Sequence, residues 1–264
     1  MIKIATPISH LFENSQFAKE IISNSDCLEC RDHSLSRDFD NQELFHCGIQ
    51  PIHKIHEDDF AFLQKIAKVK PQLRLISFHM GSSYGEPELK NNMYCPQGKE
   101  YTQEELISNA GENFRQIKAI LGEKVSLAVE NNNYYPTGAY NYVTDADFIS
   151  EVVENNKVLL VLDISHARIT AHNKKIDYST YLRHLPLAEC IQLHIGNYGI
   201  NHDNIAFDSH QMPKDEEWNE VRALLSQNRS IKYLTVETYN DKDELIGSLK
   251  EARRIIDELS GKPI

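Results

Sequence analysis

Short apolar runs alternate with longer amphipathic stretches along the whole chain, and this alternation predicts a parallel sheet covered by helices. Eight of the runs are expected to be strands: Ile2–Ala5, Cys27–Cys30, Glu43–His46, Leu73–His79, Val125–Glu130, Val158–Asp163, Cys190–His194 and Tyr233–Glu237. Eight strands in a chain of 264 residues fit a single (β/α)8 TIM barrel of the α/β class. We therefore predict one barrel domain that spans residues 1–264.

Between these runs, apolar residues recur at the three- and four-residue spacing of a helix. The helices expected on this basis are Phe17–Ile22, Asp58–Val69, Gln103–Leu121, Asp145–Glu154, Tyr178–Leu182, Glu216–Ser226 and Asp243–Leu259. The longest connection, Gly81–Tyr101, is polar and rich in glycine and proline. Loops of this length in a compact domain are often lids or binding loops.

Six of the eight expected strands end on a side chain that can bind a metal ion: His46, His79, Glu130, Asp163, His194 and Glu237. Three further candidates, His166, Asp208 and His210, follow shortly after such strands. Barrel enzymes place their chemistry at the carboxyl ends of the strands, where these nine side chains would converge. We predict that all nine bind metal, that Glu130 bridges two ions, and that Glu130, Asp163 and His210 are catalytic.

The alternation within the strands supports this convergence, because successive strand side chains point to opposite faces. Residues on the same side as the candidate ligands are small or polar: Ser77, Ser126, Ala128, Gln192 and Thr235. The other side carries large apolar residues that suit packing against helices. Leu44 and Val161 are the exceptions, and we expect them to fill the barrel interior.

The composition of the candidate site bears on the number and kind of ions. Four carboxylates balance two divalent ions, and nine ligands are also enough for three. A mixed set of imidazoles and carboxylates suits iron, manganese or zinc. A single strand-end histidine is often structural, and an aspartate after a strand is often a helix cap. Their coincidence on six strands favours a metal site, with His166 and Asp208 the weakest members.

The formal net charge of −11 argues against a general nucleic-acid surface, although metal ions in a pocket leave a nucleic-acid enzyme possible. Five scattered cysteines, no signal-like start and no long apolar run predict a cytoplasmic protein without a membrane segment. Cys27 and Cys30 would face opposite sides of a strand, which disfavours a shared site. Arg168 and His172 are further candidates for substrate binding.

The ordered ligand set is similar to the trinuclear zinc site of endonuclease IV, in the xylose-isomerase-like TIM-barrel superfamily. Asp163–Ala167 reproduces the motif DxxHA of that enzyme. The endonuclease family usually has a glycine-rich segment after its Asp-x-His motif. This chain has Gln211–Trp218 there, which contains no glycine.

The chain resembles more closely the multinuclear non-heme iron oxidative enzymes, a family formerly described as a domain of unknown function. The resemblance covers roughly residues 42–240. The early segments Phe45–Gly48 and Ser77–His79 fit it, and three later segments carry it. These are Glu130–Tyr134 (ENNNY), Tyr181–Pro186 (YLRHLP) before His194–Gly196, and Asp208–His210 followed by Pro213, Asp215 and Trp218. The family usually has an asparagine where this chain has Ser165, so a third metal position depends on His166.

This resemblance implies two or three iron ions, O2 as oxidant, and a cysteine-containing precursor peptide as substrate, often presented with a partner protein. Three alternatives stay open. The first is an endonuclease IV-like hydrolase with zinc. The second is a sugar isomerase or epimerase that holds one manganese-like ion by Glu130, Asp163, His194 and Glu237. The third is a degenerate barrel that only binds a ligand.

Overall fold

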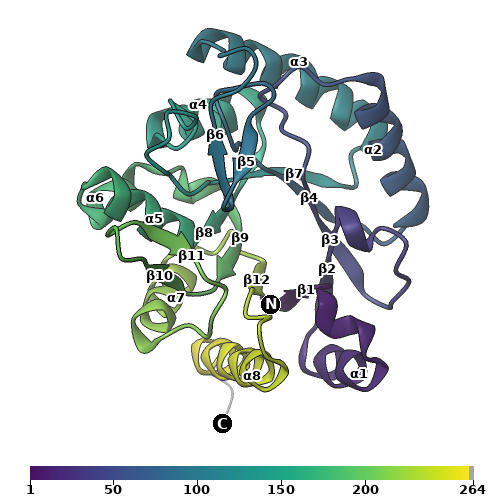
Figure 1. Cartoon of the computed structure of the whole chain (residues 1–264). Coiled ribbons are helices and arrows are strands. Elements are labelled where there is room, and N and C mark those ends of the chain that lie inside the picture. Colours follow the sequence, from purple (N-terminus) through teal and green to yellow (C-terminus); the bar gives the residue numbers. More distant parts are fainter. Residues whose placement is uncertain (262–264) are drawn as a thin grey trace.

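The computed structural model describes residues 1–261, and its centre is a closed barrel of eight parallel strands (Figure 1). The barrel strands are β1 (Lys3–Pro7), β2 (Cys27–Arg31), β3 (Gln42–Cys47), β4 (Leu75–Phe78), β7 (Ser126–Glu130), β8 (Leu159–Asp163), β9 (Cys190–Ile195) and β12 (Tyr233–Val236). Each strand pairs with its neighbours in chain order, and β1 closes the barrel against β12. The predicted (β/α)8 fold is confirmed.

The helices surround the barrel on its outside (Figure 1). They are α1 (Ser15–Asn24), α2 (Glu57–Val69), α3 (Gln103–Leu121), α4 (Ala146–Asn156), α5 (Ile164–Lys174), α6 (Tyr178–His184), α7 (Asp215–Gln227) and α8 (Lys242–Leu259). Three short 3-10 helices, His10–Glu13, Asp32–Ser34 and Leu187–Glu189, lie in the connections. All seven helices predicted from the sequence are present with small shifts at their ends.

Helix α5 was not predicted, and the reason lies in its burial. Seven of its eleven residues are buried, polar ones such as Ser165 and Thr170 included, so no polar stripe alternates with an apolar one. Its start is nevertheless well defined. The Asp163 carboxylate, at the end of β8, accepts a hydrogen bond from the backbone N–H of His166 and caps the helix.

The apolar core has two parts. A small cluster fills the barrel interior: Ala5, Cys27, Leu44, Leu75, Ala128, Val161 and Ile191. A larger cluster lies between the strands and the surrounding helices. Leu44 and Val161 therefore fill the interior as predicted. Cys27 belongs to the inner cluster and Cys30 to the outer one, which confirms that the two thiols lie on opposite faces.

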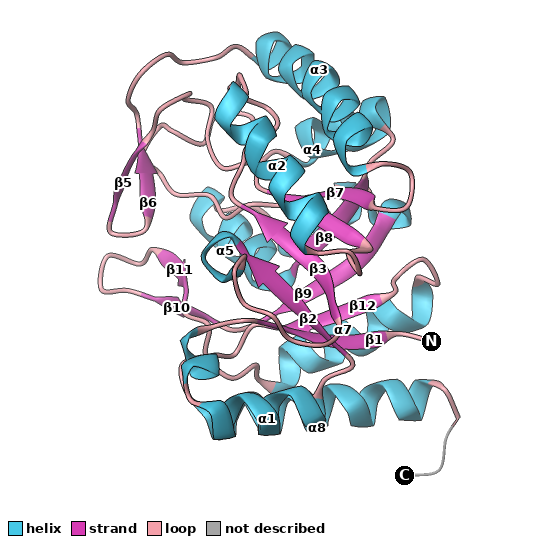
Figure 2. Cartoon of the chain, turned by 90° about the vertical axis from the view of Figure 1, so that its right-hand side faces the viewer, coloured by secondary structure: helices cyan, strands magenta, loops and turns pink. Residues whose placement is uncertain are grey.

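Two antiparallel hairpins extend from the end of the barrel opposite the amino terminus of β1 (Figure 2). The first, β5 (Glu88–Lys90) with β6 (Met93–Cys95), lies within the long connection that the sequence singled out. The second, β10 (Tyr198–Ile200) with β11 (Ala206–Asp208), follows β9 and ends at one of the candidate ligands. Within residues 1–261, no helix has the length and apolar character to cross a membrane.

Candidate metal centre

The nine candidate ligands come together at the carboxyl ends of the barrel strands. Seven of them fall into three groups whose ligand atoms lie within 4.8 Å of one another: His46, His79 and Glu130; Glu130, Asp163 and His166; and His194 and Glu237 with Glu29. The two others, Asp208 and His210, adjoin the second and third groups. Glu130 belongs to two groups and also contacts His194 of the third.

The first group joins β3, β4 and β7. His46 Nε2 lies 2.8 Å from His79 Nε2 and 3.4 Å from Glu130 Oε2. His79 Nδ1 lies 3.5 Å from the same oxygen. The other nitrogen of His46, Nδ1, lies 2.7 Å from the hydroxyl of buried Ser77, which neighbours His46 in the β3–β4 register. Burial lowers the pKa of His46 well below its usual value, so this ring is a neutral ligand.

Glu130 lies at the centre of the site, and its side chain is buried among histidines. Its Oε1 lies 2.8 Å from His194 Nδ1, without the alignment of a hydrogen bond, and its Oε2 has no hydrogen-bond partner among the described residues. Burial alone would raise the pKa of this carboxyl, but the imidazoles around it, His46 first, hold the pKa well below its usual value. Glu130 is therefore an anion that faces histidine nitrogens on several sides.

The second group adds the start of α5. His166 Nδ1 donates a hydrogen bond to the carbonyl oxygen of Asn131, 3.0 Å away, and Nε2 therefore faces the carboxylates of Asp163 and Asp208. His166 Nε2 lies 3.9 Å from Asp163 Oδ2 and 3.5 Å from Asp208 Oδ2. Burial raises the pKa of Asp163 to about 7. Burial alone would lower the pKa of His166, yet the Asp163 and Glu130 carboxylates raise it well above its usual value.

His210 completes this side of the site from the loop after β11. Its Nε2 lies 3.0 Å from Asp208 Oδ2, and its Nδ1 lies 3.7 Å from Glu237 Oε2. The ring packs on Tyr239 with centroids 4.5 Å apart. His210 has a φ of 48°, in the left-handed region, and Asn240 donates a hydrogen bond to its carbonyl. The loop is thus held in a strained conformation that presents the ring to the site.

The third group includes two residues that the sequence analysis missed, Glu29 and Arg31 of β2. His194 Nε2 lies 3.1 Å from Glu29 Oε2, and Arg31 binds Glu29 and Glu237. Burial alone would lower the pKa of His194, but Glu29 and Glu237 raise it well above its usual value. The sequence did contain a signal for Glu29 and Arg31. Together with Cys27 they alternate on one face of the strand, and both are charged. The predicted strand ended at Cys30, so Arg31 lay outside it and the alternation was not recognised.

The arrangement fits divalent metal ions. Glu130 Oε2 and His194 Nδ1 are buried, have no hydrogen-bond partner among the described residues, and face other ligand atoms. Such atoms are costly to bury unless something binds them. The histidines offer one nitrogen to the site while a hydroxyl, carbonyl or carboxylate holds the other, as for Ser77, Asn131 and Glu29. This is the usual support of metal-binding imidazoles.

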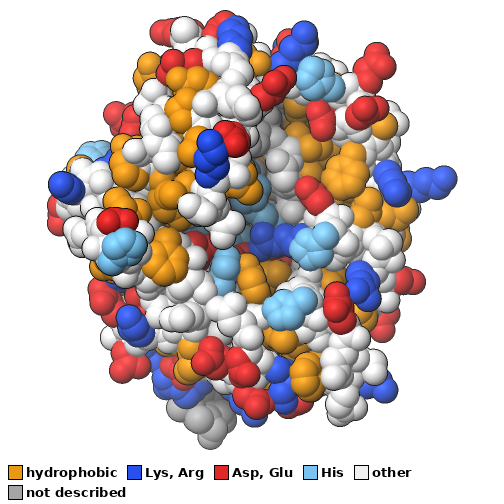
Figure 3. Space-filling model, viewed as in Figure 1, with side chains coloured by type: hydrophobic (Ala, Val, Ile, Leu, Met, Phe, Trp, Pro, Cys, Tyr) orange, Lys and Arg blue, Asp and Glu red, His pale blue; other side chains and the backbone are white. Residues whose placement is uncertain are grey.

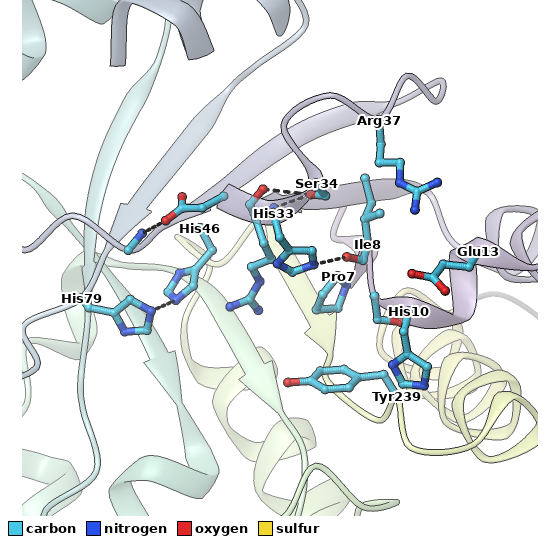
Figure 4. A pocket seen from close by; sticks show the side chains of 14 residues that line it. Pro7, Ile8, His10, Glu13, His33, Ser34, Arg37, His46, His79 and Tyr239 are labelled. Atoms are coloured by element: carbon cyan, nitrogen blue, oxygen red, sulfur yellow. Dashed lines mark hydrogen bonds between the residues drawn. The ribbon is translucent and has the colours of Figure 1, made fainter. Parts of the chain in front are cut away.

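A cavity of about 660 Å³ reaches the site from the side of β1, β2 and β3. His46 and His79 line its inner end, and His33 and Tyr239 line its walls (Figure 4). Arg31 lines the same cavity. The space-filling view shows histidine side chains around a hollow near the centre of this face (Figure 3). Of the first group, His79 is open to the cavity, with a side chain 32% exposed, whereas the side chains of His46 and Glu130 are almost fully buried, at 1% and 2%.

Arg168 and His172, proposed from the sequence as substrate-binding residues, are engaged elsewhere. Arg168 binds Glu216 and Glu220 of α7, and its guanidinium lies over the ring of Tyr178. His172 Nε2 lies 3.1 Å from the carbonyl oxygen of Asn204. Both residues lie on α5, which the sequence analysis did not foresee, and the helix directs these side chains towards its neighbours. None of these contacts involves a candidate ligand, so the structure gives no support for a role in substrate binding.

Solved structures confirm the fold. A D-tagatose 3-epimerase-like protein is 16% identical with a TM-score of 0.65, and covers 98% of this chain and 99% of its own. A xylose isomerase-like TIM barrel protein from Mycobacterium smegmatis in complex with magnesium is 10% identical with a TM-score of 0.60, and covers 98% of both chains. At these identities the similarity concerns the fold.

Sequence comparisons identify the family. A UPF0276 protein of Bordetella pertussis is 28% identical over 53% of this chain and 49% of its own length. A UPF0276 protein of Acaryochloris marina is 26% identical over 42% of this chain and 39% of its own. The chain thus spans half or less of the length of these relatives. The model of the family described as RiPP precursor modification enzyme MbnB/TglH/ChrH matches residues 54–258, most of the chain. The resemblance seen in the sequence is confirmed, and the chain belongs to this family.

Proposed function

We propose that this chain is a multinuclear, iron-dependent enzyme that oxidises a cysteine-containing precursor peptide with O2. The family supports an enzyme that modifies precursor peptides. The finer assignment, an oxidation that uses iron, rests on the ligands at the inner end of the cavity.

One observation carries this assignment. His46, His79 and Glu130 are two histidines and one carboxylate whose ligand atoms lie close together beside an open cavity. Two histidines and one carboxylate with open positions are typical of non-haem Fe(II) oxygenases. Iron bound there would supply the change of valence that a reaction of a thiol with O2 requires. The nine predicted ligands and Glu130 as a shared carboxylate provide for at least one further ion.

The residues of the chain would prepare this reaction in distinct ways. Ser77 orients His46, and Glu130 supplies a negative charge whose pKa lies well below its usual value. The cavity admits a peptide side chain to the first group, while the burial of Glu130 keeps water from the far side of the centre. Arg31, His33 and Tyr239 are placed to contact the substrate along the walls.

The alternatives use the same residues differently. A sugar isomerase would need one ion on Glu130, Asp163, His194 and Glu237, and it would leave His46 and His79 without a role. A phosphodiester hydrolase with zinc would use the whole set, because a redox-inert ion also activates water. The experiment below is designed to separate hydrolysis from oxidation.

The test compares two metals and two substrates. Metal-free protein is loaded anaerobically with Fe(II) or with Zn(II), then given cysteine-containing peptides encoded near its gene or a duplex with an abasic site. We expect O2 uptake and a mass change of a peptide with Fe(II) only. The variant His79→Gln should lose this activity, and His172→Gln, outside the centre, should keep it. Cleavage of the duplex with Zn(II), without O2 uptake with Fe(II), would overturn the proposal.

A further inference from the structure

Arg31 places a permanent positive charge inside the candidate metal centre. Its Nη2 lies 2.8 Å from Glu29 Oε1 and donates a hydrogen bond to Glu237 Oε1. The side chain is 19% exposed, and the side chains of Glu29 and Glu237 are only 1% and 5% exposed. A guanidinium does not lose its proton in a protein. The group Glu29, His194 and Glu237 therefore already contains a cation between its two carboxylates.

The remaining atoms of Glu29 are also engaged. Its Oε2 accepts a hydrogen bond from Gln192 Nε2 at 2.6 Å and lies 3.1 Å from His194 Nε2. His194 thereby keeps Nδ1 for the centre, 2.8 Å from Glu130 Oε1. A carboxylate that holds the far nitrogen of a metal-binding histidine orients that ligand. Glu29 occupies this position, behind the imidazole.

The other two groups have a different charge pattern. Glu130, Asp163 and Asp208 have only histidines as ion-pair partners within 4 Å in the described part of the chain. Five carboxylates surround the centre once Glu29 is counted, and Arg31 offsets one of them. Four negative charges then remain, which two divalent ions balance. In the described part of the chain, Arg31 is therefore the only permanent cation paired with a carboxylate of the centre.

We infer that Arg31 acts as a built-in cation, which closes the Glu29–His194–Glu237 group to a metal ion of its own and leaves His194 Nδ1 and Glu237 Oε2 as ligands for the rest of the centre. The inference deepens the proposed function and rests on its metal centre. It assigns Glu29 and Arg31 as positioning residues: Glu29 holds His194, and Arg31 holds one oxygen of Glu237 away from metal. Glu237 Oε2, on the side of His210, stays available as a ligand.

Metal stoichiometry tests this inference independently of catalysis. Metal-free full-length protein is titrated with Zn(II) alone, desalted and analysed for bound zinc per chain, and its thermal unfolding is followed with and without zinc. Four proteins are compared: the wild type, Arg31→Ala, Arg31→Lys and the double variant Glu29→Gln/Arg31→Met. The lysine variant keeps the charge. The double variant removes both members of the ion pair and serves if Arg31→Ala alone folds poorly without metal.

We expect equal zinc content in the wild type, the lysine variant and the double variant, and one more zinc ion per chain in Arg31→Ala. The alanine variant should also show the largest rise in melting temperature on addition of zinc, since the additional ion then neutralises Glu29 and Glu237. Zinc content of folded Arg31→Ala equal to that of the wild type would overturn the inference while leaving the metal centre in place. More zinc in the double variant than in the wild type would also overturn it. A wild type that binds one ion or none would instead refute the multinuclear centre itself.

Discussion

Replacement of Ser77 by alanine should weaken metal binding without unfolding the barrel. The hydroxyl lies 2.7 Å from His46 Nδ1, and both residues are buried on neighbouring strands. When a metal occupies Nε2, Nδ1 carries the proton and needs an acceptor. Without Ser77 this buried N–H has no acceptor, which costs roughly 1–3 kcal/mol. At about 1.4 kcal/mol per factor of ten, metal affinity should fall roughly 5- to 150-fold.

The loss should fall mainly on the metal-bound protein. Burial holds the pKa of His46 well below its usual value, so the ring is neutral without metal and can adopt the other tautomer. Affinity is measured by competition with a chromophoric chelator, and stability by thermal unfolding of the metal-free protein. Ser126→Ala is the matched control, because Ser126 is an exposed residue of the adjacent strand β7. Equal affinity of Ser77→Ala and wild type, in folded protein, would refute this role of the hydroxyl.

Three further predictions concern the ligands and their surroundings. Glu130→Gln should bind at most one ion per chain by elemental analysis, because it removes the charge shared by the groups; retention of two ions would refute the bridging role. Burial raises the pKa of Asp163 to about 7, so protons compete with metal below that pH. Metal affinity, measured by chelator competition from pH 5.5 to 8.5, should rise by about tenfold or more per pH unit below pH 7 and keep rising above it, because the raised pKa values of His166 and His194 let protons compete there too. A pH-independent affinity would contradict this. Arg168→Met should lower the free energy of unfolding in urea by about 1–3 kcal/mol, because the partly buried Glu220 loses its cationic partner and keeps only the hydroxyl of Tyr178, yet metal content should not change. A loss of bound metal in this variant would contradict the assignment of Arg168 to the helix layer.

The fold could be predicted from the sequence because two local patterns, the apolar runs and the alternation within strands, agreed along most of the chain. Apolar runs gave the strands, and side chains of one parity, such as Ser77 and Thr235, marked the face that turns inward. Parallel strands then brought their carboxyl ends together without any further information. The nine predicted ligands meet for this reason, and their role in binding metal stays a prediction.

What escaped prediction depends on contacts between distant segments. Helix α5 shows no polar stripe because the barrel and its neighbours bury it nearly all round. The hairpins β5–β6 and β10–β11 are three residues per strand, too short for a reliable alternation. The role of Arg31 in the site could not be recognised, because its partner Glu237 lies 206 residues away in the chain. No local pattern reports such a pairing.

The carboxylate of Asp163 divides its two oxygens between separate tasks. Oδ1 accepts the hydrogen bond that starts α5, at 2.7 Å from the backbone nitrogen of His166, and Oδ2 faces the centre. Loss of a helix cap costs about 1 kcal/mol, so selection for a stable barrel alone would retain an acceptor here. A descendant that abandoned metal chemistry would thus keep Asp163, or drift only as far as asparagine or serine. Ser77 and His46, whose pairing serves no helix, would be the first to diverge in such a lineage.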